Sequence, residues 1–79
     1  MSDLAPTPWA LTRREIDSMT AIVQTGSSKL AARELGLSHR TVELYLDRAK
    51  KKMKTGHMVT AALMWDRWQR WDRGERAGA

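Results

Sequence analysis

The hydrophobic positions between residues 38 and 53 repeat at helical spacing. Four apolar side chains stand at i, i+4, i+7 and i+11, namely Val42, Leu46, Ala49 and Met53. This spacing places them on one stripe of a 3.6-residue helix. The opposite stripe is mostly charged and holds Arg40, Leu44, Asp47 and Lys51. We therefore predict a helix over 39–54, capped by the Ser38 hydroxyl, with one anchored face and one charged face.

Entry into the major groove of DNA requires such a helix, with one face packed on the protein and the other able to form hydrogen bonds. A charged face is also the ordinary surface of a solvated helix, so the pattern alone leaves both interpretations open. The preceding segment is therefore needed to choose between them.

A first helix is predicted over 13–25. Residues 12–15, Thr-Arg-Arg-Glu, have the form of a capping box, and Leu11 and Ile16 flank it as a hydrophobic staple. An apolar stripe follows, and Gly26 is a suitable residue to end the helix.

A short second helix is predicted over 28–35, capped by Ser27 or Ser28 and ended by Gly36. Only about three residues then separate it from the helix over 39–54. A short helix, a tight turn containing glycine and a second amphipathic helix form a helix-turn-helix. The basic helix then occupies the recognition position of this motif, which favours DNA binding.

A fourth helix is predicted over 57–73, because Gly56 interrupts the chain and helical spacing resumes after it. Its apolar side chains cover about half of the helix surface: Met58, Ala61, Ala62, Met64, Trp65, Trp68 and Trp71, with Val59 and Leu63 as a second patch. A three-helix body this small can hardly cover so much apolar surface, and large exposed apolar patches usually indicate a partner. We expect a dimer interface here, formed by Met58, Ala61, Ala62, Trp65 and Trp68.

The two ends of the chain lack this periodicity. Residues 1–10 contain both prolines and are expected to form a flexible arm, with Trp9 packing against the body. Residues 74–79 are expected to form a frayed tail. The domain itself is expected to span 11–73.

Composition restricts the possible functions. A chain of 79 residues has room for one small domain, which buries only about 60% of its unfolded surface, so association with a second copy is an expected source of stability. There is no cysteine, which excludes disulfides, thiolate metal sites and a cysteine nucleophile. The net charge of +5 favours a polyanionic partner, either nucleic acid or an anionic membrane surface. No long apolar run or signal-peptide pattern is visible, so a cytoplasmic, nucleoid-associated protein is expected.

From Leu11 to Leu63 the sequence resembles the LuxR/GerE-type helix-turn-helix domain of bacterial transcription regulators. The resemblance is carried by Leu11-Thr12-x-Arg14-Glu15-Ile16, Ser27-Ser28-Lys29, Leu35-x-Leu37-Ser38-x-x-Thr41-Val42 and Leu46-x-x-Ala49-x-x-Lys52-Met53. It implies an all-α, four-helix domain in which the third helix enters the major groove and the fourth pairs two protomers. The chain departs from the family pattern at Glu43 and Asp47, where basic residues are frequent.

The candidate DNA-binding residues come from the resemblance and from side-chain chemistry. The resemblance implies phosphate contacts for Lys29 and Thr41, and positions facing base edges for Glu43, Leu44 and Asp47. Chemistry alone allows phosphate contacts for Arg40, Arg48, Lys50 and Lys51, and His39 is expected at the groove or on the surface. Arg40 could instead bind guanine, a carboxylate could accept from cytosine N4, and Leu44 could meet a thymine methyl. Asp47 could also simply pair with Lys51 at i+4.

Three functions are compatible with these features. The favoured one is a sequence-specific regulator that binds double-stranded DNA at an inverted repeat as a homodimer, with repression slightly preferred. The alternative is a protein-interaction module that binds another regulator or RNA polymerase through the tryptophan-rich helix, because Leu35-Gly-Leu-Ser-x-x-Thr-Val42 and Leu46-Asp-Arg-Ala-Lys50 also resemble region 4 of bacterial sigma factors. A membrane-surface peptide is disfavoured, since Asp66 and Asp72 dilute the basic charge of the last helix.

Enzyme activity is not expected. The two histidines, His39 and His57, are 18 residues apart without a metal-binding spacing, and no glycine-rich phosphate loop is present. No metal or cofactor is therefore predicted.

Overall fold

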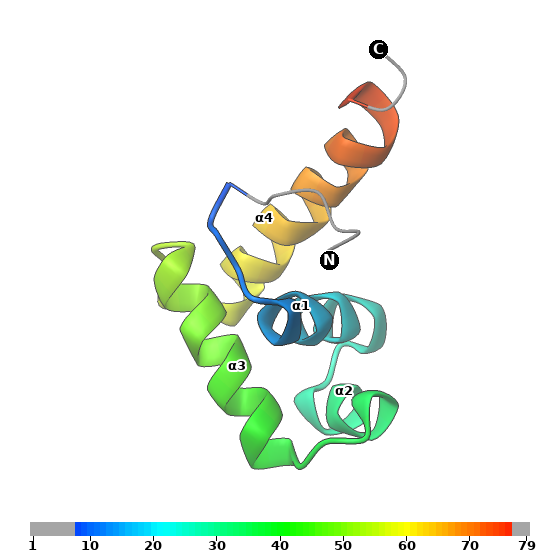
Figure 1. Ribbon diagram of the computed structural model, residues 1–79, viewed down its shortest axis with the longest axis vertical. Helices are drawn as coiled ribbons and strands as arrows, with labels where there is room; N and C mark the ends of the chain where they lie inside the picture. Colours follow the sequence, from blue (N-terminus) through cyan, green and yellow to red (C-terminus); the bar gives the residue numbers. More distant parts are fainter. Residues whose placement is uncertain (1–7, 77–79) are drawn as a thin grey trace.

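The computed structural model describes residues 8–76, which form an all-α fold (Figure 1). The elements in order are α1 (Arg13–Thr25), α2 (Ser28–Leu35), α3 (His39–Lys52), α4 (Met58–Trp71) and a π-helical turn, η1 (Asp72–Arg76). The predicted all-α class and the four helices are confirmed. Most of the predicted arm, residues 1–7, and the end of the predicted tail, residues 77–79, lie outside the described residues.

The last two helices are shorter than predicted. α3 ends at Lys52 rather than 54, because Lys54 adopts a left-handed conformation with φ of 60° that a helix cannot continue through. α4 begins at Met58, since His57 is still extended and serves as the N-cap. It ends at Trp71, where the chain passes into η1, so Gly74 belongs to a π-helical turn.

Local signals in the sequence account for the bounds of α1 and α2. Thr12 and Glu15 form the predicted capping box, in which each side chain accepts a hydrogen bond from the other residue's amide. α2 is capped by Ser27, whose hydroxyl accepts from the amide of Leu30 at 3.3 Å. Both helices end at a glycine in the left-handed region, Gly26 and Gly36.

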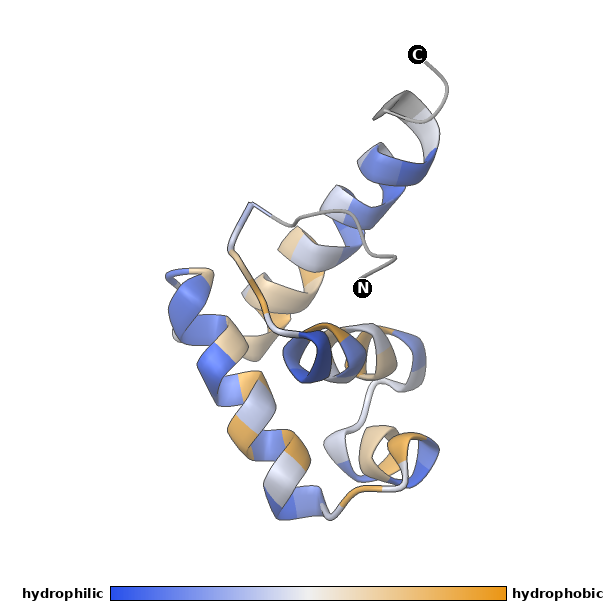
Figure 2. Cartoon of the chain, in the orientation of Figure 1, coloured by the Kyte–Doolittle hydropathy of each residue, from blue (hydrophilic) through white to orange (hydrophobic). Residues whose placement is uncertain are grey.

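α1 lies at the centre of the domain and contacts each of the other three helices (Figure 1). The predicted apolar stripe of α3 is buried against it, with Val42 and Ala49 fully buried. Figure 2 shows the corresponding alternation along α3 of hydrophobic and hydrophilic positions, and a hydrophilic far end of α4. The rest of the core consists of Met19, Ala21, Ala31, Ala32, Leu46, Met53, Ala61 and Trp65.

The tryptophans are largely accommodated within the chain. Trp65 is 1% exposed, and its ring lies beside Trp68 with 5.3 Å between centroids. Trp9 packs on both of them, at 6.2 Å from Trp65 and 6.3 Å from Trp68, as its sequence context predicted. Ala61, another residue expected at a dimer interface, is fully buried. Ala61 and Trp65 therefore offer no surface to a second copy, because the chain's own core and Trp9 cover them.

A charged contact joins the start of α1 to the end of α3. Glu15 is 2% exposed, and its Oε1 lies 2.8 Å from Nζ of Lys52. Burial alone raises the pKa of the Glu15 carboxyl, but hydrogen bonds from Lys52 and from the Thr12 amide, together with the charge of Lys52, outweigh it. The net effect holds the pKa of Glu15 below its ordinary value.

This shift makes stability dependent on pH. A carboxyl whose pKa is lower in the folded state stabilises the fold above its unfolded pKa, and that contribution is lost as the pH falls through the folded value. We expect the free energy of unfolding to decrease as the pH falls below the ordinary pKa of a glutamate, about 4.3, and to decrease less in Glu15→Gln. Urea titrations followed by circular dichroism at several pH values measure this difference.

The matched control is Glu34→Gln, which removes one carboxylate from the exposed surface of α2. We expect it to keep the pH dependence of the unaltered chain. An equal slope for Glu15→Gln and the unaltered chain would contradict a stabilising role for the ionised Glu15 carboxylate.

Candidate nucleic-acid interface

The turn between α2 and α3 sets the direction in which α3 leaves the body. Gly36 adopts a φ of 68°, a left-handed backbone conformation that residues with a side chain rarely adopt. The amide of Leu37 donates to the carbonyl of Ala32 at 3.0 Å. The Ser38 hydroxyl then accepts from the amide of Thr41 at 3.1 Å and donates to the Thr41 hydroxyl at 2.7 Å. The first turn of α3 is therefore fixed by its own sequence, as Ser38 predicted.

The ten candidate DNA-binding residues all lie on the surface. Lys29, Arg40, Glu43, Leu44, Arg48 and Lys51 are exposed, while His39, Thr41, Asp47 and Lys50 are half-buried. Leu44, the one apolar side chain among the candidates, is 47% exposed. Nine of the ten come from one helix, α3, and Lys29 lies in the first turn of α2.

Two sides of this surface can be distinguished. Helical spacing places Arg40, Leu44, Arg48 and Lys51 away from the buried stripe. A second set, Glu43, Asp47 and Lys50, lines a surface hollow together with Ser28 of α2 and Met58 of α4. The two acidic candidates thus lie on the flank of α3 that faces the N-terminal ends of α2 and α4.

Asp47 forms the ion pair that its spacing allowed. Its Oδ2 lies 3.2 Å from Nζ of Lys51, whose side chain is 78% exposed, and the Asp47 side chain is about half exposed. An exposed pair at i, i+4 is worth only about 0.3–0.5 kcal/mol, so it can open when other partners approach. The structure therefore leaves Asp47 and Lys51 able to exchange partners.

His39 makes a contact that the sequence did not reveal. Its Nε2 lies 2.7 Å from Oγ of Ser28, the first residue of α2, and 3.4 Å from Oε2 of Glu43. The four-residue spacing of His39 and Glu43 was a usable signal for the second contact. The first joins residues 11 apart on different helices, so spacing along one helix could not predict it.

Lys52 is the basic residue of α3 that turns away from this surface. Three lysines occupy the last turn, Lys50, Lys51 and Lys52, where positive charge is favourable beside the helix C-terminus. Lys52 is held by Glu15 at the start of α1. Of the three lysines in the last turn, Lys52 therefore stabilises the fold, whereas Lys50 and Lys51 remain on the open surface.

Among residues 8–76, no cluster of three or more His, Asp or Glu side chains has the placement to hold a metal ion. None of the described helices has the length and apolarity needed to cross a membrane.

Comparison with known families supports the interpretation of α3 as a nucleic-acid-binding helix. A family model described as GerE, bacterial regulatory proteins, luxR family, matches residues 10–65. The match includes α1, α2 and α3 completely and the first half of α4. Searches of curated proteins and of solved structures gave no match.

The Ser38 cap provides a test of how the first turn of α3 is fixed. Ser38→Ala removes the oxygen that accepts from the Thr41 amide, and we expect a loss of about 1 kcal/mol in the free energy of unfolding. Ser38→Asn, which restores a capping oxygen, should recover most of it. Chemical denaturation measures both values, and an unchanged stability in Ser38→Ala would show that the cap does not hold this turn.

Proposed function

The chain belongs to the LuxR family of bacterial regulatory proteins, a family of DNA-binding transcription regulators, and we propose that it binds double-stranded DNA sequence-specifically as a homodimer. The observation that supports this most directly is the division of α3 into a buried apolar stripe and an exposed surface rich in basic residues. A helix anchored in this way can insert its outer face into the major groove without disturbing the fold.

The proposed contacts fall into two groups. Arg40, Glu43, Leu44 and Asp47 face the base edges. Lys29, Thr41, Arg48, Lys50 and Lys51 contact phosphates, and the first turn of α3 supports this for Thr41, because its hydroxyl accepts from Ser38 and keeps its own proton to donate. His39 lies beside them at the start of α3.

Arg40 is the residue whose replacement best separates base contacts from phosphate contacts. If it donates two hydrogen bonds to guanine, we expect Arg40→Ala to weaken binding to the preferred duplex by about 1–3 kcal/mol and to relax specificity at one base pair. If it contacts phosphate, binding to all sequences should weaken equally and the salt dependence should decrease by about one charge. Fluorescence anisotropy with duplexes selected from a random pool, at several salt concentrations, measures both effects.

Arg67→Ala serves as the control, because it removes an exposed arginine from α4, outside the α3 surface. Its affinity and salt dependence should equal those of the unaltered chain. Equal affinity of the unaltered chain for every duplex would reject sequence specificity, and a failure to bind any duplex in dilute buffer would reject DNA binding altogether.

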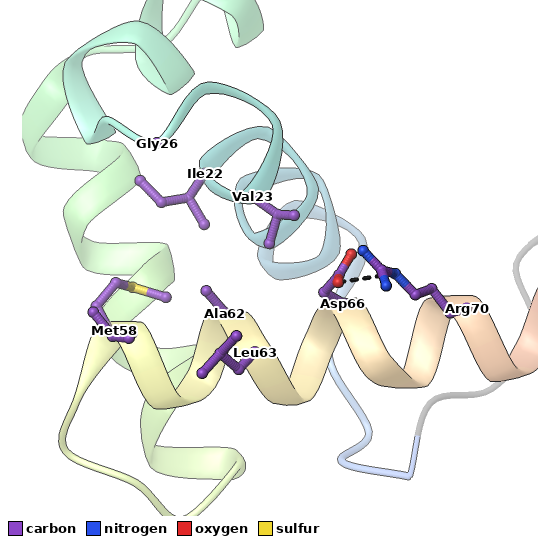
Figure 3. Close-up of a pocket in the computed structure, with 9 residues that line it drawn as sticks. Ile22, Val23, Gly26, Met58, Ala62, Leu63, Asp66 and Arg70 are labelled. Atoms are coloured by element: carbon purple, nitrogen blue, oxygen red, sulfur yellow. Dashed lines mark ion pairs between the residues drawn. The ribbon is translucent and has the colours of Figure 1, made fainter.

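The proposed dimer interface lies in an apolar groove between α1 and α4. Figure 3 shows Ile22 and Val23 of α1 facing Met58 and Ala62 of α4, with the Asp66–Arg70 ion pair at one end. Two neighbouring side chains of α4 are strongly exposed, Val59 at 74% and Leu63 at 60%. We therefore propose that Met58 and Ala62 act with Val59 and Leu63, in place of the buried Ala61 and Trp65 and of Trp68, which packs on Trp9.

A twofold pair would place two copies of α3 about 34 Å apart, one turn of DNA, and so favour an inverted repeat. A dimer bound at such an inverted repeat covers one side of the DNA over about two helical turns. We propose repression as the regulatory outcome, because a promoter occupied in this way is closed to polymerase.

Leu63→Glu tests the dimer. We expect it to raise the dissociation constant of the dimer by at least about tenfold, because a carboxylate would be buried without a partner. The monomer should stay folded, since Leu63 is 60% exposed. Thr60→Glu adds the same charge at a neighbouring exposed position and should leave association unchanged. Sedimentation equilibrium measures both, and equal association of the two variants would exclude this groove as the interface.

The alternative of a protein-interaction module that uses the tryptophan helix has weaker support. Trp65 is enclosed in the core and Trp68 packs against Trp9, so only Trp71, which is 46% exposed, remains of the aromatic surface that suggested such a partner. Isolation of a stable one-to-one complex with a second regulator or with RNA polymerase, in a chain that binds no DNA, would favour it.

A further inference from the structure

His39 occupies the junction of the two helices that form the helix-turn-helix. It is the first residue of α3, and its Nε2 contacts both Ser28 at the start of α2 and Glu43 one turn further along α3. The Ser28 contact is short, at 2.7 Å, and holds the ring in one place. The ring is therefore fixed between a residue of α2 and a candidate base-contacting carboxylate.

The chemistry of the two partners determines what the ring does. A carboxylate can only accept hydrogen bonds, whereas a serine hydroxyl can both donate and accept. The Ser28 hydroxyl and Nε2 share the hydrogen bond of 2.7 Å, whose direction depends on the tautomer of the ring. Oε2 of Glu43 lies 3.4 Å from Nε2, a longer electrostatic contact that is attractive when Nε2 carries a proton. In this arrangement His39 holds one oxygen of Glu43 and leaves the other free.

Both side chains are accessible to DNA. The His39 side chain is 41% exposed and the Glu43 side chain 59% exposed. A free glutamate at this position would have to lose the freedom of its rotatable bonds before it could accept from a base. A glutamate already held by an anchored ring loses less, so its hydrogen bond to a base amino group is more selective.

We propose that His39 is a positioning residue for sequence recognition, which holds the Glu43 carboxylate toward an amino group of cytosine or adenine in the major groove. This inference rests on the proposed DNA binding. It assigns the selectivity at one base pair to the Ser28–His39–Glu43 contact rather than to Glu43 alone.

The other acidic candidate provides the contrast. Asp47 is held by Lys51, four residues after it, and neither residue is anchored to α2 by a contact of this kind. Its partner is 78% exposed at the side chain and can move away with little cost. Lys51→Gln is therefore the matched control, because it removes the partner of an acidic residue on the same helix without touching the junction.

The test uses selection from a pool of randomised duplexes at one stated salt concentration, with sequencing of the bound fraction. We expect His39→Ala and Glu43→Gln to lower discrimination at the same base pair by about fivefold or more, with preferences elsewhere unchanged. The double variant should show no further loss, because the two residues act through one contact. His39→Gln, which retains an N–H donor, should keep more of the preference than His39→Ala.

Two further measurements distinguish a positioning role of His39 from a merely structural one. They are thermal unfolding and the affinity for a duplex without the preferred site. We expect His39→Ala to remain folded and to lose less affinity for that duplex than for the preferred one. We expect Lys51→Gln to lower affinity for all sequences without altering the preference at this base pair. An unchanged preference in His39→Ala, or an equal loss of affinity for every sequence, would overturn the inference while leaving DNA binding intact. Absence of binding by the unaltered chain would overturn both.

Discussion

The orientation of α3 depends on one contact between charged groups, in which Nζ of Lys52 lies 2.8 Å from Oε1 of Glu15. Glu15 is buried and also closes the capping box with Thr12, so one carboxylate serves both the start of α1 and the end of α3. A buried charge that loses its partner is strongly destabilising. Together with the buried side chains of Val42, Leu46 and Ala49, this contact opposes sliding of α3 along α1 and keeps its outward side chains in a defined direction.

Small side chains complete this arrangement. Ala31, Ala32, Ala49 and Ala61 are all buried, and they let the helix backbones approach closely around the few large core residues. Only Val42, Leu46 and Ala49 of α3 are buried in this core, so the other side chains of the helix stay at least partly open to a ligand.

The sequence predicted features that depend on neighbours along the chain, and missed those that depend on packing. The helices, the Thr12–Glu15 capping box and the Ser38 cap follow from residues within one turn of each other. The contact of Glu15 with Lys52 joins residues 37 apart, and no local pattern encodes it. On α4 the spacing showed two apolar patches without indicating which one faces the core. Trp9 was expected to pack against the body, but its place, on Trp65 and Trp68 of the larger patch, was not predicted. The ten candidate DNA-binding residues remain predictions, although the structure places all of them on the surface.

The pairing of the acidic residues on α3 explains how a helix with carboxylates can face a polyanion. Asp47 is paired with Lys51 before any nucleic acid approaches, and Glu43 lies 3.4 Å from Nε2 of His39, which offsets the charge of Glu43 when the ring is protonated. The repulsion between Asp47 and phosphates is reduced by its pairing, and in exchange Lys51 attracts phosphates less than a free lysine would. In return, the groove-facing surface gains acceptors, which suit the amino groups of cytosine and adenine, whereas basic side chains suit the acceptors of guanine. Under the proposed function, the carboxylates of α3 therefore lower its general affinity for DNA and favour contacts with cytosine and adenine over contacts with guanine.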